Sequence, residues 1–467
     1  MTTGTEPGAS APPHVPSRAR GRAPRAGVVT RWLPIVLLAA VGGLWLVLRI
    51  PQGTFDVLWA EDGRDFLADA LERGGWAVLL EPYAGYLHLL PRLVTAVLVA
   101  VVPLELHAVA VTLASIAFVV AVAVATFVLS ADVVRWWPAR LGIAAVPIVL
   151  PALGAEVLGN LANLHTYCLW LGCWILLAHP RRGIAGVAWA GVLLACMLTE
   201  VQAVLLVPLA LAMLRPRRRE TWLPVVATLV GAAAQVAAML LSPREGYPSL
   251  GIGIPDIVLA WLVQAVLPIV DGSRADVIAA LADVGPVVGL AALVPFAIAG
   301  VVGLVRGTSR QRIAVVTLAL LSAGIMAGCI LTSQLEVWRY ASLEGEEWLG
   351  AVVIFRYGAA AGMYCAALVP LAAGIVVDRD RDAGWRRARI ARVATASVVV
   401  VAAVGWMAVQ APETGSSRPG GAAWSVEVDE AQAACDAGAD EGQLEVAPAG
   451  WSGGLAVLTC DALGDEP

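Results

Sequence analysis

Residues 107–130 read HAVAVTLASIAFVVAVAVATFVLS, and this stretch contains no Asp, Glu, Lys or Arg. A transmembrane helix needs roughly 17–25 predominantly apolar residues, so the stretch is long enough to cross a bilayer. The whole chain of 467 residues is 59% hydrophobic and 14% charged, whereas a soluble domain carries about 25% charged residues. The composition therefore excludes a soluble enzyme, a disordered protein and a fibrous protein. It predicts an all-α, polytopic membrane protein.

Further apolar runs lie on both sides of residues 107–130. Together they predict about 11–13 transmembrane helices, because most of them approach the length that a bilayer requires. One run, 256–270, is shorter, and we expect it to lie in the membrane interface. The remaining runs lie at 32–50, 86–103, 140–158, 163–179, 184–198, 201–214, 221–241, 284–305, 313–331, 356–377 and 390–410.

Composition divides the chain into three segments. Residues 1–31 are rich in Gly, Pro, Ala and Arg and lack apolar periodicity, which predicts a disordered cytoplasmic tail. Residues 32–411 form the predicted transmembrane domain, with an external loop at 51–85. Residues 412–467 contain eleven acidic residues and one Arg, and we expect them to form a small extracytoplasmic C-terminal segment.

Arginine placement predicts the orientation in the plasma membrane, because Arg-rich loops stay in the cytoplasm. The cytoplasmic clusters in the second half of the chain lie at 215–219, 306–312 and 379–389. The C-terminal tail is then outside, where Cys435 and Cys460 can form a disulfide. In the first half, the same count places Arg181 and Arg182 outside, against the rule. One crossing between residues 86 and 179 is therefore counted wrongly, and the charges do not identify it.

The densest polar cluster follows the first apolar run, with WAEDGRD at 59–65 and EPYAGYLHLLPR at 81–92. Glu61 and Asp62 start a helical pattern, where acidic side chains stabilise the helix N-terminus. Alternatively, one of these carboxylates lies just outside the membrane and takes a proton from an attacking hydroxyl. The candidate substrate-binding residues in this cluster are Tyr83, Tyr86, His88 and Arg92.

This cluster and the architecture of residues 32–411 resemble the GT-C glycosyltransferases. These are polytopic enzymes that use polyprenyl-phosphate sugars outside the membrane. The shared features are a first span, an external loop that opens with an acidic pair, an amphipathic stretch and a second span that begins near a Tyr-rich turn. The resemblance implies a catalytic base at Glu61 or Asp62. The chain has Glu-Asp-Gly where several branches have Asp-Glu or a lone Asp, so both carboxylates stay candidates.

A second polar cluster, GNLANLHTY at 159–167, contains the only two asparagines of the chain, Asn160 and Asn163. Their side chains, with His165, are candidates for hydrogen bonding to sugar hydroxyls or phosphate. The alternative for Asn163 is a helix cap, and the alternative for His165 is simple packing.

Three more candidates lie later in the chain. Glu200 falls at the tip between two short apolar runs, where it is either solvated or a second carboxylate for the acceptor. Arg339 lies in a late loop, and FRYG at 355–358 opens a span with Arg356 and Tyr357. Arg can hold a phosphate through two parallel hydrogen bonds, although Arg at the start of a span can also snorkel to the interface.

The expected function is transfer of a sugar from a polyprenyl-phosphate donor to an envelope glycan or lipid acceptor, in the lipid bilayer of an actinobacterium-like cell. All 31 basic residues are Arg, which is typical of such GC-rich genomes. The alternative is a transporter or flippase of lipid-linked envelope precursors, which would place ionisable residues deep in several spans. A third hypothesis is a non-enzymatic membrane scaffold.

The sequence implies no cofactor with certainty. Glu61 and Asp62 could contribute to a divalent metal site, but a hard cation needs several oxygen ligands and only these two are evident. The cysteines lack a zinc-finger spacing, and the chain has no Walker A sequence. The Arg-rich loops are topology signals, so we expect no nucleic-acid partner.

Overall fold

A computed structural model describes residues 28–154, 156–243, 251–333, 335–379, 386–414, 418–448 and 454–464. Of the described residues, 76% are helical, and the predicted all-α polytopic architecture is confirmed. The first helix, α1, begins at Val28, so residues 28–31 of the predicted tail are helical. Residues 1–27 lie outside the described part of the chain.

Seven helices in the described ranges are long and apolar enough to cross a membrane. They are α1 (Val28–Arg49), α4 (His107–Leu129), α9 (Trp222–Leu241), α13 (Val287–Arg306), α14 (Ser309–Ser333), α15 (Arg356–Arg379) and α16 (Arg386–Gln410). Shorter helices complete the chain up to residue 284: α2 (Ala68–Arg73), α3 (Leu89–Val101), α5 (Trp137–Val149), α6 (Leu164–Leu177), α7 (Gly183–Met197), α8 (Val207–Met213), α10 (Ile254–Trp261), α11 (Leu267–Val270) and α12 (Arg274–Val284).

Helix α15 forms the centre of the bundle, and 78% of its most apolar stretch of 18 residues is buried inside the protein. Glycine at a helix interface lets the backbones of two helices approach closely, because it has no side chain between them. A Cβ at Gly358 would collide with the backbone carbonyl of Gln264, and a Cβ at Gly374 would lie 2.7 Å from side-chain atoms of Ala139 and Val134. The glycines of α15 therefore allow the close helix packing that positions Arg356 at its first residue.

Helix α3 does not cross the bundle, so the predicted crossing at 86–103 is wrong. At its start, the Leu89 N–H donates to the carbonyl oxygen of Leu198. Just after its end, the carbonyl of Leu104 accepts a 2.8 Å hydrogen bond from the Trp424 indole of the C-terminal segment. That segment also bonds to Asp56, so both ends of α3 lie at one end of the bundle.

The short length of α3 is compatible with this placement, although α5 also has 13 residues, so the contacts at both ends of α3 decide it. Its 13 residues span about 20 Å at 1.5 Å per residue, whereas the hydrocarbon core is about 30 Å thick. Without this crossing, Arg181 and Arg182 fall at the same end as the other Arg clusters. Consistent with that, Arg181 pairs with Asp132 at the end of α4, so the discrepancy in the charge count is resolved.

The run 256–270 also begins and ends on one side. Near its start, Asp256 accepts a 2.8 Å hydrogen bond from the Ala341 N–H in the loop between α14 and α15. At its end, the carbonyl of Val270 accepts from the indole of Trp406, near the end of α16. Both contacts lie at the end of the bundle that holds the start of α15 and the end of α16. The segment α10–α11 therefore fits the interfacial placement that its length suggested.

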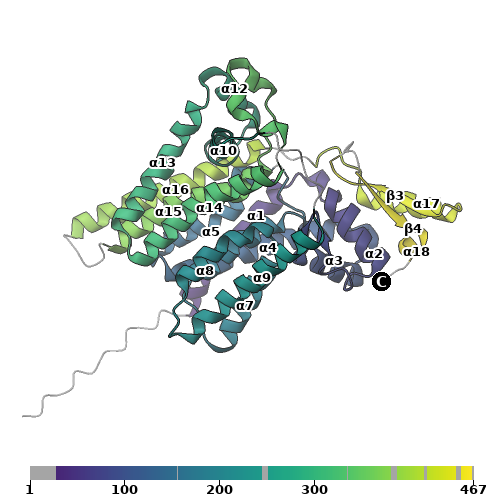
Figure 1. The fold of residues 1–467 in the computed structure, drawn as a ribbon, viewed down its shortest axis with the longest axis horizontal. Coiled ribbons are helices and arrows are strands. Elements are labelled where there is room, and N and C mark those ends of the chain that lie inside the picture. Colours follow the sequence, from purple (N-terminus) through teal and green to yellow (C-terminus); the bar gives the residue numbers. More distant parts are fainter. Residues whose placement is uncertain are drawn as a thin grey trace, which may run out of the picture.

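The C-terminal segment forms a small lobe on this same end (Figure 1). It contains α17 (Trp424–Asp436), the antiparallel strands β3 (Glu441–Glu445) and β4 (Leu455–Thr459), and α18 (Cys460–Gly464). A disulfide joins Cys435 to Cys460. The lobe lies beside α2 and α3, and the Thr459 N–H of β4 donates to Glu72 of α2 at 2.7 Å.

Candidate functional site

Asp62 is buried and binds a backbone turn. It is 1% exposed, and its two carboxylate oxygens accept hydrogen bonds of 2.8 Å from the backbone N–H groups of Leu161 and Ala162. Burial raises the pKa of Asp62 to about 7, although the two backbone bonds and the nearby Arg418 oppose this shift. Both oxygens are therefore occupied by the turn that carries the two asparagines.

Glu61 has a different environment from its neighbour. It immediately precedes a π-helical turn at Asp62–Leu67 and is half-buried. Within the described ranges its side chain makes no hydrogen bond or ion pair. It lies within electrostatic range of Arg64 and Arg356. Of the two adjacent acids, Glu61 is the one whose carboxylate is available to a ligand.

Arg356 pairs with an acid that the sequence analysis missed. Its guanidinium lies 2.6 Å from the carboxylate of Glu156 and 5.0 Å from the ring centroid of Tyr357. Glu156 falls inside the apolar run 140–158. A lone acidic residue in such a run is expensive in a membrane, and that cost is the signal that could have identified it.

Asn160 and Asn163 close the turn through their own side chains. The side-chain oxygen of Asn160 accepts from the backbone and the side-chain amide of Asn163, both at 2.9 Å. Both side-chain amides also donate to the carbonyl of Glu156. Asn163 stands at the N-cap position of α6, but its side chain makes no capping bond. The two asparagines thus fix the shape of the turn beside Glu156.

His165 and Glu200 form a pair next to this turn. The Nδ1 atom of His165 contacts a carboxylate oxygen of Glu200, whose other oxygen accepts a 2.7 Å hydrogen bond from the Gln202 N–H. Glu200 is only 5% exposed, so the interpretation of a solvated tip is wrong. A buried carboxylate of this kind holds an imidazole ring in one orientation.

An aromatic group connects the two polar clusters. Tyr83 and Tyr86 lie on the two-stranded hairpin of β1 (Pro82–Tyr83) and β2 (Tyr86–Leu87). The ring of His88 lies 4.4 Å from Tyr86, 5.4 Å from Tyr83 and 5.9 Å from His165, between centroids. His88 is 3% exposed, so its ring packs between the hairpin and α6.

Of the other two predicted arginines, one borders the aromatic group but is buried and paired, and the other is exposed. Arg92 is 3% exposed and forms a 2.8 Å ion pair with Asp69 of α2, and it lies over the ring of Phe66. Its role in the structure is to attach α3 to α2. Arg339 is exposed in the loop before α15. Arg356 is therefore the predicted arginine that joins the candidate site.

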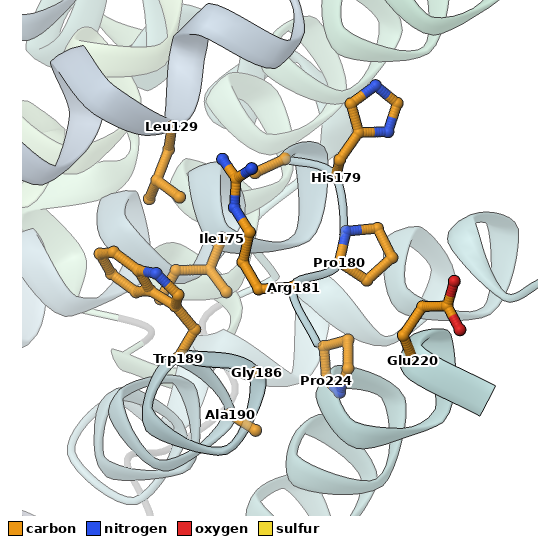
Figure 2. A pocket seen from close by; sticks show the side chains of 11 residues that line it. Leu129, Ile175, His179, Pro180, Arg181, Gly186, Trp189, Ala190, Glu220 and Pro224 are labelled. Carbon is orange, nitrogen blue, oxygen red and sulfur yellow. The ribbon is translucent and has the colours of Figure 1, made fainter. Parts of the chain in front are cut away.

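Two hollows lie outside the cluster of predicted residues. A crevice of about 20 Å³ lies at the opposite end of the bundle, where Figure 2 shows His179, Arg181, Pro224 and Glu220 around it. Such a volume holds about one water molecule. A groove of about 1290 Å³ follows α1 between α4, α5 and α16, and its lining is almost entirely apolar, from Trp32 to Trp45.

The described residues contain no group of three or more His, Cys, Asp or Glu side chains that could hold a metal ion. No protein-family model and no curated protein sequence matches this chain. The candidate site is thus defined by its own residues at one end of the helical bundle.

Proposed function

We propose that this protein is a membrane glycosyltransferase of the GT-C type, which moves a sugar from a polyprenyl-phosphate carrier to an acceptor in the cell envelope. The carrying observation is that side chains from five distant segments gather at one end of the bundle. These side chains are Glu61, Asp62, Tyr83, Tyr86, His88, Asn160, Asn163, His165, Glu200, Arg356 and Tyr357. Such a reaction needs a base, a phosphate-binding cation and a place for the lipid chain.

In this proposal Glu61 is the general base. It takes the proton of the acceptor hydroxyl while that oxygen bonds to the anomeric carbon of the donor sugar. The bond between the anomeric carbon and the phosphate oxygen breaks, and the phosphate leaves with the electron pair. Asp62 is less suited, because its two oxygens already accept backbone hydrogen bonds.

Arg356 is the proposed ligand of the leaving phosphate. Its guanidinium has five N–H donors in a planar fork, so the pair with Glu156 leaves donors that can bind phosphate oxygens. His165, oriented by Glu200, can add a further N–H donor. Charge from these groups would stabilise the phosphate as negative charge develops on it.

The apolar groove along α1 supports a lipid-linked donor. Its lining extends to Trp45 and Val149, near Arg49, which donates to the carbonyl of Pro151 before the turn of the site. A hydrocarbon chain of the carrier would be excluded from water in such a groove. The opposite end of the bundle holds the Arg clusters, and the positive-inside rule then assigns the site to the extracytoplasmic face.

The test is sugar transfer in membrane vesicles with a panel of polyprenyl-phosphate sugars. A general base contributes about 10²–10⁴-fold, so Glu61→Gln should lower the transfer rate by that factor. The matched control is Glu336→Gln, a change at an exposed glutamate in the loop after α14. Wild-type transfer by Glu61→Gln would contradict the assignment of the base. Movement of the labelled lipid across the vesicle without transfer would favour the transporter.

A further inference from the structure

Arg418 reaches from the C-terminal lobe into the interior of the protein. It is 2% exposed, and its guanidinium donates to the carbonyl of Gly159 at 2.6 Å and to the hydroxyl of Thr112 at 3.3 Å. The carbonyl of Thr54 lies 3.5 Å away as a third acceptor. A buried cation is tolerated only where such partners compensate for its lost hydration.

The turn at 159–162 is therefore held from two sides. Arg418 binds the carbonyl of Gly159, while Asp62 binds the N–H groups of Leu161 and Ala162. Gly159 has a φ of +80°, and a Cβ at this position would lie 2.9 Å from the guanidinium. The turn leaves room for the arginine only because residue 159 is glycine.

The lobe also binds the segment that carries the acidic pair. The N–H of Ala447 donates to the carbonyl of Leu58 at 2.9 Å, and the carbonyl of Ala447 accepts from Ala60 at 2.8 Å. The hydroxyl of Ser425 donates to Asp56 at 2.6 Å. The lobe thus bonds to three residues, Asp56, Leu58 and Ala60, in the segment immediately before Glu61.

We propose that the C-terminal lobe (residues 418–448 and 454–464) acts as a brace that holds the candidate site in place, and that Arg418 is its positioning residue. Arg418 and Asp62 together fix the turn at 159–162. The turn carries Asn160, whose side-chain amide donates to the carbonyl of Glu156. Glu156 is the acid that pairs with Arg356. The brace operates whatever reaction the site performs, so it does not depend on the proposed transferase activity.

The test is hydrogen exchange of the full-length protein in lipid nanodiscs. In the wild type, the amides of Leu161 and Ala162 should exchange slowly, because they donate to a buried carboxylate. Arg418→Gln should accelerate exchange of the 159–163 peptide at least about 10-fold, with unchanged exchange in α13–α15. Arg418→Lys should give an intermediate rate, since lysine keeps the charge but loses the forked geometry.

The matched control lies within the lobe. Glu427→Ala removes the side chain that accepts from the Glu445 N–H and should leave the 159–163 peptide at the wild-type rate. The changes Arg418→Gln and Asp62→Asn act on one turn, so their combined effect should be less than the product of the two single effects. If Arg418→Gln prevents folding, Arg418→Lys and Thr112→Val, which removes one acceptor, provide the same comparison.

The proposal is overturned if Arg418→Gln leaves the exchange of 159–163 unchanged, or if Arg418→Lys and Arg418→Gln are equally fast. The second result would mean that the positive charge at position 418 does not help to hold the turn. This outcome is separate from the test of function. Accelerated exchange in Arg418→Gln together with normal transfer by Glu61→Gln would keep the brace and reject the assigned base.

Discussion

Two adjacent carboxylates, Glu61 and Asp62, have opposite surroundings at the residue scale. Asp62 is buried and accepts hydrogen bonds from two backbone N–H groups. Glu61 is half-buried and interacts electrostatically with Arg356. The difference arises because consecutive residues in a helical turn point about 100° apart, so one faces the 159–162 turn and the other does not.

The raised pKa of Asp62 gives a prediction of pH dependence. Burial moves its pKa from 3.8 to about 7 in the folded protein, so folding favours the protonated acid. This stabilisation is complete below about pH 4 and is lost as the pH rises through about 7, at roughly 1.4 kcal/mol for each pH unit in between. The unfolding temperature of the wild type should therefore fall more steeply between pH 5 and pH 8 than that of Asp62→Asn.

A thermal unfolding series in detergent at several pH values measures this difference. Asp283→Asn, at an exposed aspartate of α12, is the matched control and should follow the wild type. Parallel curves for the wild type and Asp62→Asn would show that Asp62 does not titrate in this range.

At this scale the sequence predicted most of the residues that meet, because polar side chains near span ends are few and costly. It did not find Glu156 or Arg418. Glu156 stood in an apolar run, and the only Arg of the C-terminal tail gave no sign of its partners 259 and 306 positions away. Contacts at such separations depend on tertiary packing, which periodicity does not encode.

At the scale of elements, α3 shows why hydropathy alone miscounted the crossings. Its sequence is apolar enough to resemble a span, but the helix has 13 residues and ends before Pro103. It buries Arg92 and Thr95 and exposes Val97 and Val101. Its polar side chains thus pack against the protein, and its apolar side chains face outward, as in any helix that contacts lipid. The thirteen predicted apolar runs correspond to seven long and six shorter apolar helices in the described ranges. Which of them cross could be decided only from the contacts at both ends.

The placement of α3 predicts the accessibility of the loop that follows it. A cysteine introduced by Glu105→Cys should react with a membrane-impermeant maleimide from the same side as the C-terminal lobe. Arg217→Cys, in an exposed loop at the opposite end, should react only after the membrane is permeabilised. The wild-type protein measures the background from its native cysteines. Reaction of Glu105→Cys only after permeabilisation would show that α3 crosses.

At the scale of the whole molecule, a helical bundle carries the candidate site at one end, and a small disulfide-linked lobe lies beside α2 and α3 (Figure 1). The Arg clusters lie at the other end, with Arg181 bound to Asp132. This polarity favours a one-sided site over a path through the membrane, because the predicted site residues meet at a single end.

The disulfide should stabilise the lobe and, through it, the site. Cys435 and Cys460 are 25 positions apart, and closing a loop of that length contributes about 3 kcal/mol in the chain-entropy model. Cys435→Ser should therefore increase protease cleavage of the lobe at temperatures where the wild type resists. Cys329→Ser, a change at a cysteine of α14 outside the lobe, is the control. Equal resistance of Cys435→Ser and the wild type would show that the lobe folds without its disulfide.

The most direct test of the central claim is a structure of the protein in a lipid nanodisc with a polyprenyl-phosphate sugar bound. We expect the donor phosphate within hydrogen-bond distance of Arg356, the sugar between Glu61 and His165, and the lipid chain in the groove along α1. A donor phosphate bound at the opposite end, among the Arg clusters, would contradict the account, because Glu61 would then be a full membrane thickness away from the reacting carbon.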